Sequence, residues 1–173
     1  MGAHDQGADA TAGRWLIIPR TLCFVTHGRD VLLLRRAPHK RVYPNKYNGV
    51  GGHIERDEDP LSGAVREIQE ETGLQVRNVL FCGCSHVDAG QDTGIMVMIF
   101  RAEATSRQFV DSGEGKLEWV PQDRVLELDL VEDLSLILPR VLAMSPGDPP
   151  FFAHVSYNAA DELQLAFAPN GPV

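Results

Sequence analysis

The sequence predicts an α/β (α+β) protein in which a mixed β-sheet is sandwiched between helices and a β-hairpin follows at the C-terminus. Many short β-branched and apolar runs predict strands, whereas two segments have a helical pattern. Strands with few helices between them favour a mixed sheet with helices on its faces. The chain has 173 residues, enough for one domain with a sizeable core.

The predicted strands follow one another closely along the chain. Residues 15–26 and 31–37 are apolar runs on either side of a turn at Gly28, which predicts a hairpin. Cys82 and Cys84 alternate in another apolar run, so we expect them on one face of a strand. The remaining strands are expected at 75–87, 93–104 and 116–121, and the terminal hairpin at 151–158 and 162–169.

The first predicted helix has clear ends. Asp59 suits the N-cap and Pro60 the first helical position, and Gly73 suits the left-handed residue that ends a helix. A stripe at helical spacing is expected to be buried, and it consists of Leu61, Ala64, Val65, Ile68 and Thr72. Residues 132–144 predict a second helix, which Pro139 is expected to kink or shorten.

Composition excludes several kinds of partner. The net charge of −8 and the pI of about 5.2 argue against a nucleic-acid duplex or an anionic membrane surface. Three cysteines make no disulfide framework and indicate a reducing compartment. Residues 1–13 are polar and predict a disordered leader, without the apolar core of a signal peptide. We therefore expect one domain over 14–173, cytoplasmic, as a monomer or homodimer.

Three acids on the first helix are the strongest chemical signal. Glu67, Glu70 and Glu71 stand at i, i+3 and i+4, so they project from one face. Charge alone would indicate a solvated acidic surface. However, clustered carboxylates are also the ligands that hard cations such as Mg²⁺ prefer.

The residues around the acids decide between these interpretations. Gly52 is followed after five residues by Glu58 and after seven more by the run Arg66-Glu67-Ile68-Gln69-Glu70-Glu71-Thr72-Gly73-Leu74. This spacing resembles the Nudix box, G-x5-E-x7-R-E-U-x-E-E-x-G-U with U aliphatic, at every defined position. The resemblance implies a Nudix-type fold and a hydrolase that cleaves phosphoric anhydrides with Mg²⁺ (or Mn²⁺).

The resemblance also implies roles for the box residues. Glu70 and Glu71 would be the central metal ligands, with Glu67 a third and the Gly52 carbonyl a further one. Arg66 would pair with a carboxylate and orient it, as an arginine fork can. Glu58 would brace the loop. The general base stays open between Glu70, Glu67 and an acid on a distant loop.

Outside the box, the chain resembles the MutT-type, 8-oxo-dGTP diphosphatase branch of the family. In the segment 47–52, Asn48 corresponds to a purine-contacting Asn, although an Asn before Gly is also typical of a turn. Glu114 lies five residues before Trp119, an offset that implies a further metal-contacting Glu. Asp111 and Glu118 are nearby competitors for that role.

The base pocket has further candidates. Glu132 and Asp133 resemble an acidic pair that reads the oxidised purine, although acids are also favoured at a helix N-terminus. Ile17, Ile18 and Phe24 in the first strand are candidates for the pocket wall. Neither the Pro typical of ADP-ribose pyrophosphatases nor the Tyr typical of dinucleoside polyphosphate hydrolases stands at the usual place after the box.

Three functions remain. The favoured one is hydrolysis of a nucleoside triphosphate, such as an oxidised or damaged purine nucleotide, to the monophosphate and pyrophosphate. The second is hydrolysis of another X-linked nucleoside diphosphate, such as ADP-ribose or a nucleotide sugar. The third is a nucleotide sensor without turnover.

Overall fold

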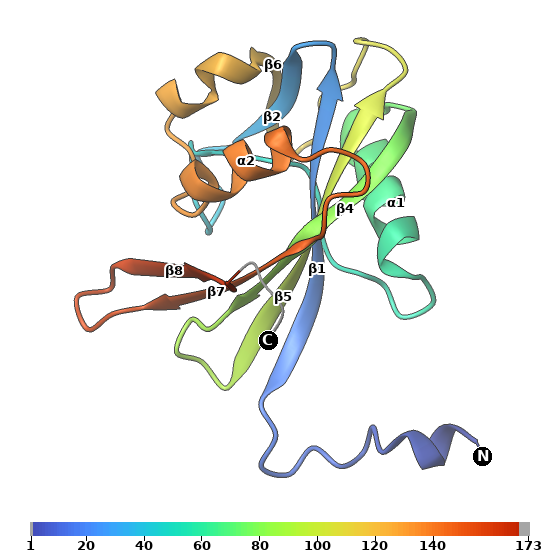
Figure 1. The fold of residues 1–173 in the computed structure, drawn as a ribbon, viewed down its shortest axis with the longest axis vertical. Coiled ribbons are helices and arrows are strands. Elements are labelled where there is room, and N and C mark those ends of the chain that lie inside the picture. Colours follow the sequence, from blue (N-terminus) through green and yellow to red (C-terminus); the bar gives the residue numbers. More distant parts are fainter. Residues whose placement is uncertain (1, 170–173) are drawn as a thin grey trace.

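The computed structural model describes residues 2–169, and its centre is a mixed eight-stranded sheet (Figure 1). The strands are β1 (Leu16–His27), β2 (Asp30–Arg36), β3 (Tyr47–Asn48), β4 (Val76–Val87), β5 (Thr93–Ala104), β6 (Gly115–Pro121), β7 (Phe151–Tyr157) and β8 (Leu163–Phe167). The helices are α1 (Pro60–Thr72), α2 (Leu134–Ala143) and the 3₁₀ helices η1 (Ala3–Gln6) and η2 (Gln122–Glu127).

The sheet combines both kinds of pairing. Its order is β3-β2-β1-β5-β4-β7-β8, and β6 also pairs with β2. β1 runs parallel to β5 and β4 parallel to β7, while the other pairs are antiparallel. The predicted mixed sheet and the terminal β7–β8 hairpin are therefore confirmed.

The two long helices cover opposite faces of the sheet (Figure 1). Side chains alternate across β1, so Phe24 packs in the core beneath α2, whereas Cys23 and Val25 pack in the core beneath α1. Burial on both sides explains why the middle of this strand is continuously apolar. The sandwich of a sheet between helices is thus confirmed.

Helix α1 begins and ends as its sequence predicts. The Asp59 carboxylate accepts hydrogen bonds from the backbone N–H groups of Leu61 at 2.8 Å and Ser62 at 3.0 Å, and Gly73 has a left-handed φ of 70°. The buried stripe is narrower than predicted, because Leu61 and Val65 are exposed. The buried surface instead includes Gly63, whose missing side chain leaves room for the Glu58 carboxylate.

The expectation that Cys82 and Cys84 share a face is wrong. Phe81 pairs with Phe100 and Gly83 pairs with Ile99, so Cys82 is the extra residue of a β-bulge. The bulge breaks the alternation, and it leaves Cys82 in the core beneath α2 while Cys84 pairs with a residue of the α1 side. Residues after the bulge consequently project to the face of the sheet opposite to the one that a regular strand would give them.

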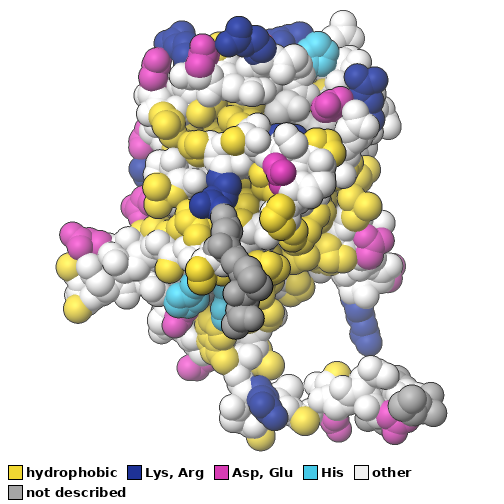
Figure 2. Space-filling view, viewed as in Figure 1, with side chains coloured by type: hydrophobic (Ala, Val, Ile, Leu, Met, Phe, Trp, Pro, Cys, Tyr) yellow, Lys and Arg dark blue, Asp and Glu magenta, His cyan; other side chains and the backbone are white. Residues whose placement is uncertain are grey.

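Helix α2 starts at Leu134, two residues later than predicted, and continues past Pro139 to Ala143. Figure 2 shows hydrophobic side chains gathered over the middle of the molecule, where α2 lies against the sheet. Residues before β1 extend away from the sheet (Figure 1), and the predicted domain boundary at residue 14 stays a prediction. Among the described residues, no helix has the length and apolarity to cross a membrane.

Candidate active site

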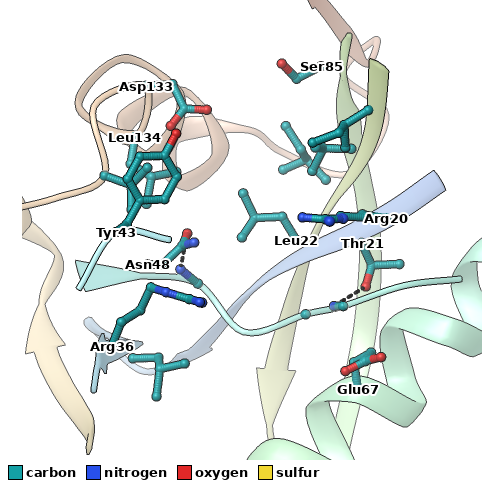
Figure 3. Close-up of a pocket in the computed structure, with 18 of the residues that line it drawn as sticks. Arg20, Thr21, Leu22, Arg36, Tyr43, Asn48, Glu67, Ser85, Asp133 and Leu134 are labelled. Atoms are coloured by element: carbon teal, nitrogen blue, oxygen red, sulfur yellow. Dashed lines mark hydrogen bonds between the residues drawn. The ribbon is translucent and has the colours of Figure 1, made fainter. Parts of the chain in front are cut away.

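A cavity of about 690 Å³ opens between α2, the loop before α1 and the sheet (Figure 3). This volume lies in the usual range for a small-molecule site. One end is lined by Glu67, Glu70 and Glu71 of α1 and by two glycines of the loop, Gly51 and Gly52. The other end is mainly apolar, and its lining includes Leu22, Val87, Ile95, Val97, Ile99, Leu134, Ile137, Val155 and Leu163. The cavity therefore joins an acidic end to an apolar compartment.

The two glycines let the loop lie tightly between β1 and α1. The Gly52 carbonyl accepts the backbone N–H of Thr21 at 2.8 Å. A Cβ on Gly52 would stand 2.5 Å from the Glu67 carboxylate. Gly51 has a φ of +145°, and a Cβ there would collide with the Thr21 carbonyl. Only glycine fits both positions without moving the strand or the acid.

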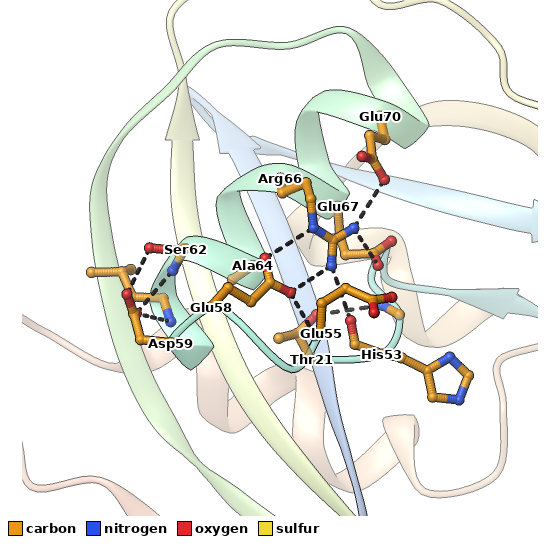
Figure 4. Close-up of polar contacts among 12 residues, drawn as sticks. Thr21, His53, Glu55, Glu58, Asp59, Ser62, Ala64, Arg66, Glu67 and Glu70 are labelled. Atoms are coloured by element: carbon orange, nitrogen blue, oxygen red, sulfur yellow. Dashed lines mark hydrogen bonds and ion pairs between the residues drawn. The ribbon is translucent and has the colours of Figure 1, made fainter.

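Arg66 holds the acids of the box together (Figure 4). Its Nε and Nη2 donate to the two oxygens of Glu58 at 3.0 and 2.7 Å, a bidentate pair. Nη1 donates to Glu67 at 2.9 Å and to Glu70 at 3.0 Å, and Nη2 also donates to the His53 carbonyl at 3.0 Å. The guanidinium thus makes five hydrogen bonds, which is its full complement of donors.

Glu58 braces the loop, as the box predicts. Besides its pair with Arg66, its carboxylate accepts the Glu55 backbone N–H at 2.8 Å. The Arg66 guanidinium, followed by that N–H, lowers the pKa of Glu58 below its usual value. The pairing of Arg66 with carboxylates is likewise as expected, since it contacts three of them.

Glu71 is the most confined acid of the cluster. Its carboxylate accepts the Gly51 N–H at 3.0 Å. Burial, with smaller contributions from the charges of Glu67 and Glu114, raises its pKa to about 7. A buried carboxylate next to two other acids is costly to ionise without a cation.

Within residues 2–169, no three His, Cys, Asp or Glu side chains are arranged as a ready metal site. Arg66 turns Glu67 and Glu70 toward itself, and Lys40 binds Glu114 at 2.7 Å. The chemistry of the donors nevertheless fits a hard divalent cation, because all are oxygens and the raised pKa of Glu71 marks a place where positive charge is lacking.

Two glycine carbonyls, and not only that of Gly52, are candidates for the predicted metal ligand. The Gly52 carbonyl already accepts the Thr21 N–H, which leaves it one lone pair. The Gly51 carbonyl accepts no hydrogen bond in the described part of the chain. Gly51 is therefore a second candidate that the sequence reasoning missed, although its place beside Gly52 in the glycine pair was visible.

Glu114 is separated from its two competitors by position. Glu114 lines the cavity. Asp111 instead accepts the Leu117 backbone N–H at 3.2 Å, and Glu118 accepts the Tyr47 hydroxyl at 2.6 Å. Both competitors lie outside the cavity lining, so the structure brings only Glu114 toward the box acids.

Asn48 is the last residue of β3, so the expected turn is not found there, and its contact with a purine stays a prediction. Its Oδ1 accepts the Gly49 N–H at 2.8 Å. Its side chain also lines the cavity (Figure 3), and its Nδ2 has no hydrogen-bond partner among the described residues. The amide donors are thus free for a ligand.

The acidic pair before α2 is divided by the start of the helix. Asp133 is the N-cap residue and lines the cavity, where burial raises the pKa of its carboxyl. Its place at the N-cap agrees with the preference of helix N-termini for acids, and its contact with a purine stays a prediction. Glu132 is exposed and lies outside the cavity lining.

The first strand contributes different residues from those predicted. Ile17 and Ile18 are exposed beyond the cavity, and Phe24 is fully buried in the core. The cavity is lined instead by Arg20, Thr21 and Leu22 of β1 and by Ser85 of β4. A strand pattern shows which residues alternate, but it does not show where along the strand a cavity lies.

Comparison with known proteins gives consistent matches. A family model described as the NUDIX domain matches residues 17–141. The oxidized purine nucleoside triphosphate hydrolase of Mus musculus is 29% identical over 145 residues, which is 83% of this chain and 88% of the mouse protein. A crystal structure of a MutT protein from Bacillus halodurans has a TM-score of 0.75 and 28% identity, and covers 90% of this chain and 100% of that chain.

Another relative matches over a shorter stretch. The m7GpppN-mRNA hydrolase NUDT17 of Xenopus laevis is 43% identical over 51 residues, which is 30% of this chain. The match spans only 17% of the length of that relative.

Proposed function

Because this chain belongs to the Nudix family, we propose that it is a metal-dependent hydrolase of nucleoside triphosphates that releases pyrophosphate, with oxidised or damaged purine nucleotides as favoured substrates. Family membership supports the coarser statement that it is a hydrolase acting on pyrophosphate bonds. The observation that carries the finer proposal is the cavity, which joins the acids of α1 to a mainly aliphatic compartment where Asn48 and Asp133 add polar groups.

The acidic end would hold the reacting phosphates. Glu67, Glu70, Glu71 and Glu114 would bind Mg²⁺ (or Mn²⁺), helped by a glycine carbonyl of the loop. A bound cation supplies polarisation of the phosphoryl oxygens and neutralises their charge. If Glu67 and Glu70 bound the cation, the bidentate pair of Arg66 with Glu58 would still hold the loop in place.

Glu70 is the acid best placed to accept a proton from water. Its side chain is 60% exposed, whereas that of Glu67 is 14% exposed and lies against Gly52. Among residues 2–169, the Glu70 carboxylate accepts one hydrogen bond, from Arg66. We therefore assign the general base to Glu70 and positioning of the cluster to Arg66.

The apolar end would hold the base. Its aliphatic lining suits a flat aromatic ring, and the free Nδ2 of Asn48 can donate to a ring nitrogen or carbonyl. The Asp133 carboxylate can accept a hydrogen bond from an N–H of the base at the same edge. The likeness to the mouse oxidized purine nucleoside triphosphate hydrolase over most of both chains favours a purine.

A substrate panel with separate phosphate and pyrophosphate readouts tests the proposal. We expect Mg²⁺-dependent pyrophosphate release, fastest from 8-oxo-dGTP among 8-oxo-dGTP, dGTP, dATP and ADP-ribose, and loss of it in Glu70→Gln. The control is Glu127→Gln, because Glu127 is equally exposed (60%) and also pairs with an arginine, but outside the cavity.

The same panel separates the alternatives. Hydrolysis of ADP-ribose to AMP and ribose 5-phosphate, with no pyrophosphate from any triphosphate, would support an X-linked nucleoside diphosphate as substrate. Nucleotide binding without turnover, unchanged in Glu70→Gln, would support a sensor. Either result would contradict the proposed reaction.

A further inference from the structure

A polar row crosses the apolar floor of the cavity. Arg20 of β1 pairs with Val97 of β5, and Val97 pairs with Ser85 of β4. Residues in register on adjacent strands project to the same face, and all three line the cavity. On either side of this row, the cavity residues that project to the same face of these strands are aliphatic, namely Leu22, Val87, Ile95 and Ile99.

Both polar members of this row lack partners. Ser85 is 2% exposed, and its Oγ makes no hydrogen bond within the described chain. The Arg20 Nε is also buried without a partner, and no ion pair of the described residues involves Arg20. Buried polar groups are normally hydrogen-bonded. Two unpaired ones in a single cavity indicate that a ligand completes them.

The chemistry of the row restricts that ligand. A guanidinium has donors and no acceptor, whereas a hydroxyl can donate or accept. Arg20 therefore needs an acceptor, and the commonest arginine contact with a base is bidentate, to the carbonyl oxygen and ring nitrogen of guanine. Adenine has an amino group at that carbon. Its N–H donors would face the N–H donors of the guanidinium, and no hydrogen bond could form between them.

The size of the row suits a bicyclic base. Arg20 and Ser85 are two strands apart, which places their Cα atoms about 10 Å from each other. Figure 3 shows the Arg20 side chain running from β1 into the cavity beside Leu22, so its guanidinium shortens that gap. The phosphates would lie toward Glu67, Glu70 and Glu71.

We propose that Arg20 and Ser85 bind a carbonyl-bearing edge of the base, so that the enzyme selects oxo-purine over amino-purine nucleotides. This inference rests on the proposed function in one respect, that the ligand is a purine nucleotide. It adds Arg20 of β1 and Ser85 of β4 to Asn48 of β3 and Asp133 at the start of α2 as residues that recognise the base.

Binding of two monophosphates tests the inference without turnover. dIMP and dAMP differ at the six-position of the ring, where one has a carbonyl and the other an amino group. By calorimetry we expect wild type to bind dIMP at least about 10-fold more tightly. Arg20→Met should remove this preference by lowering the affinity for dIMP, while the affinity for dAMP should change less than about 3-fold. The control Arg124→Met replaces an exposed arginine outside the cavity and should change neither.

Other outcomes would overturn the inference. Equal weakening of dIMP and dAMP in Arg20→Met would mean that Arg20 binds phosphate. No preference in wild type, or no binding of either monophosphate at millimolar concentration, would also refute it. Because binding is measured separately from pyrophosphate release, a protein that prefers dIMP but releases no pyrophosphate would refute the proposed reaction alone.

Ser85→Ala gives an independent test. Removing an unpaired buried hydroxyl should raise the melting temperature of the free protein by about 2–4 °C. The same change should weaken dIMP by about 3- to 10-fold. Higher stability with weaker binding is the signature of a hydroxyl kept for a ligand, and unchanged dIMP affinity would exclude Ser85 from the site.

Discussion

The metal-free protein should become less stable as the pH rises from 5 to 8, and Glu71→Gln should remove much of this loss. In the folded chain the pKa of Glu71 is about 7, against an ordinary 4.5. Between these values an unfolded Glu71 is ionised while the folded one keeps its proton. Folding therefore takes up a proton, and stability falls as pH rises through this window and then levels off.

The size of the effect follows from the two pKa values. At about 1.4 kcal/mol per pH unit, their difference corresponds to at most about 3.5 kcal/mol. Glutamine keeps an acceptor oxygen for the Gly51 N–H but carries no charge near Glu67 and Glu114. The variant should accordingly be more stable than wild type at pH 8 and nearly equal to it at pH 5.

Urea denaturation in EDTA at pH 5, 6, 7 and 8 measures this directly. Taking the difference between wild type and Glu71→Gln cancels other titrating groups, such as Asp133, whose pKa is also raised. The difference should grow by about 1–3 kcal/mol across the series. A difference that stays constant with pH would refute the electrostatic account of Glu71.

Three further perturbations test other parts of the site. Chelation with EDTA should abolish turnover, and Mg²⁺ or Mn²⁺ should restore it in wild type but not in Glu70→Gln; restoration in both would contradict the role of Glu70. Arg66→Met should lower the urea midpoint, since it leaves the partly buried carboxylates of Glu58 and Glu67 without their arginine; an unchanged midpoint would refute this. Asp133→Ala should raise KM about 10-fold, whereas exposed Glu132→Ala should leave KM within about 2-fold, and equal effects would contradict the division of the pair.

Much of the fold could be predicted because local signals and the tertiary structure agree. The ends of α1 depend on Asp59, Pro60 and Gly73, and each residue acts through its own backbone geometry. The predicted buried stripe of α1 was wrong at Leu61 and Val65, which are exposed. How many helix residues a sheet covers depends on the strands that the helix packs against. That contact is formed partly by Gly63, whose burial no periodicity indicates.

The acidic end of the site could be predicted because its residues are close in sequence. Spacing along one helix fixes the shared face of Glu67, Glu70 and Glu71. The end of the cavity proposed to hold the nucleobase could not be predicted, because its residues come from separate strands. The bulge at Cys82 reverses the alternation, and this brings Ser85 to the cavity face; nothing in the sequence identifies the bulge.

The proposed reaction depends on the acids of α1 acting through a bound metal on a phosphoric anhydride. The most direct test measures Mg²⁺ binding and pyrophosphate release on the same samples of wild type and Glu70→Gln, with 8-oxo-dGTP as substrate. We expect Mg²⁺-dependent release in wild type, and release at least about 100-fold slower in Glu70→Gln at saturating Mg²⁺. Equal pyrophosphate release by the two proteins, or release that continues in EDTA, would contradict the central claim.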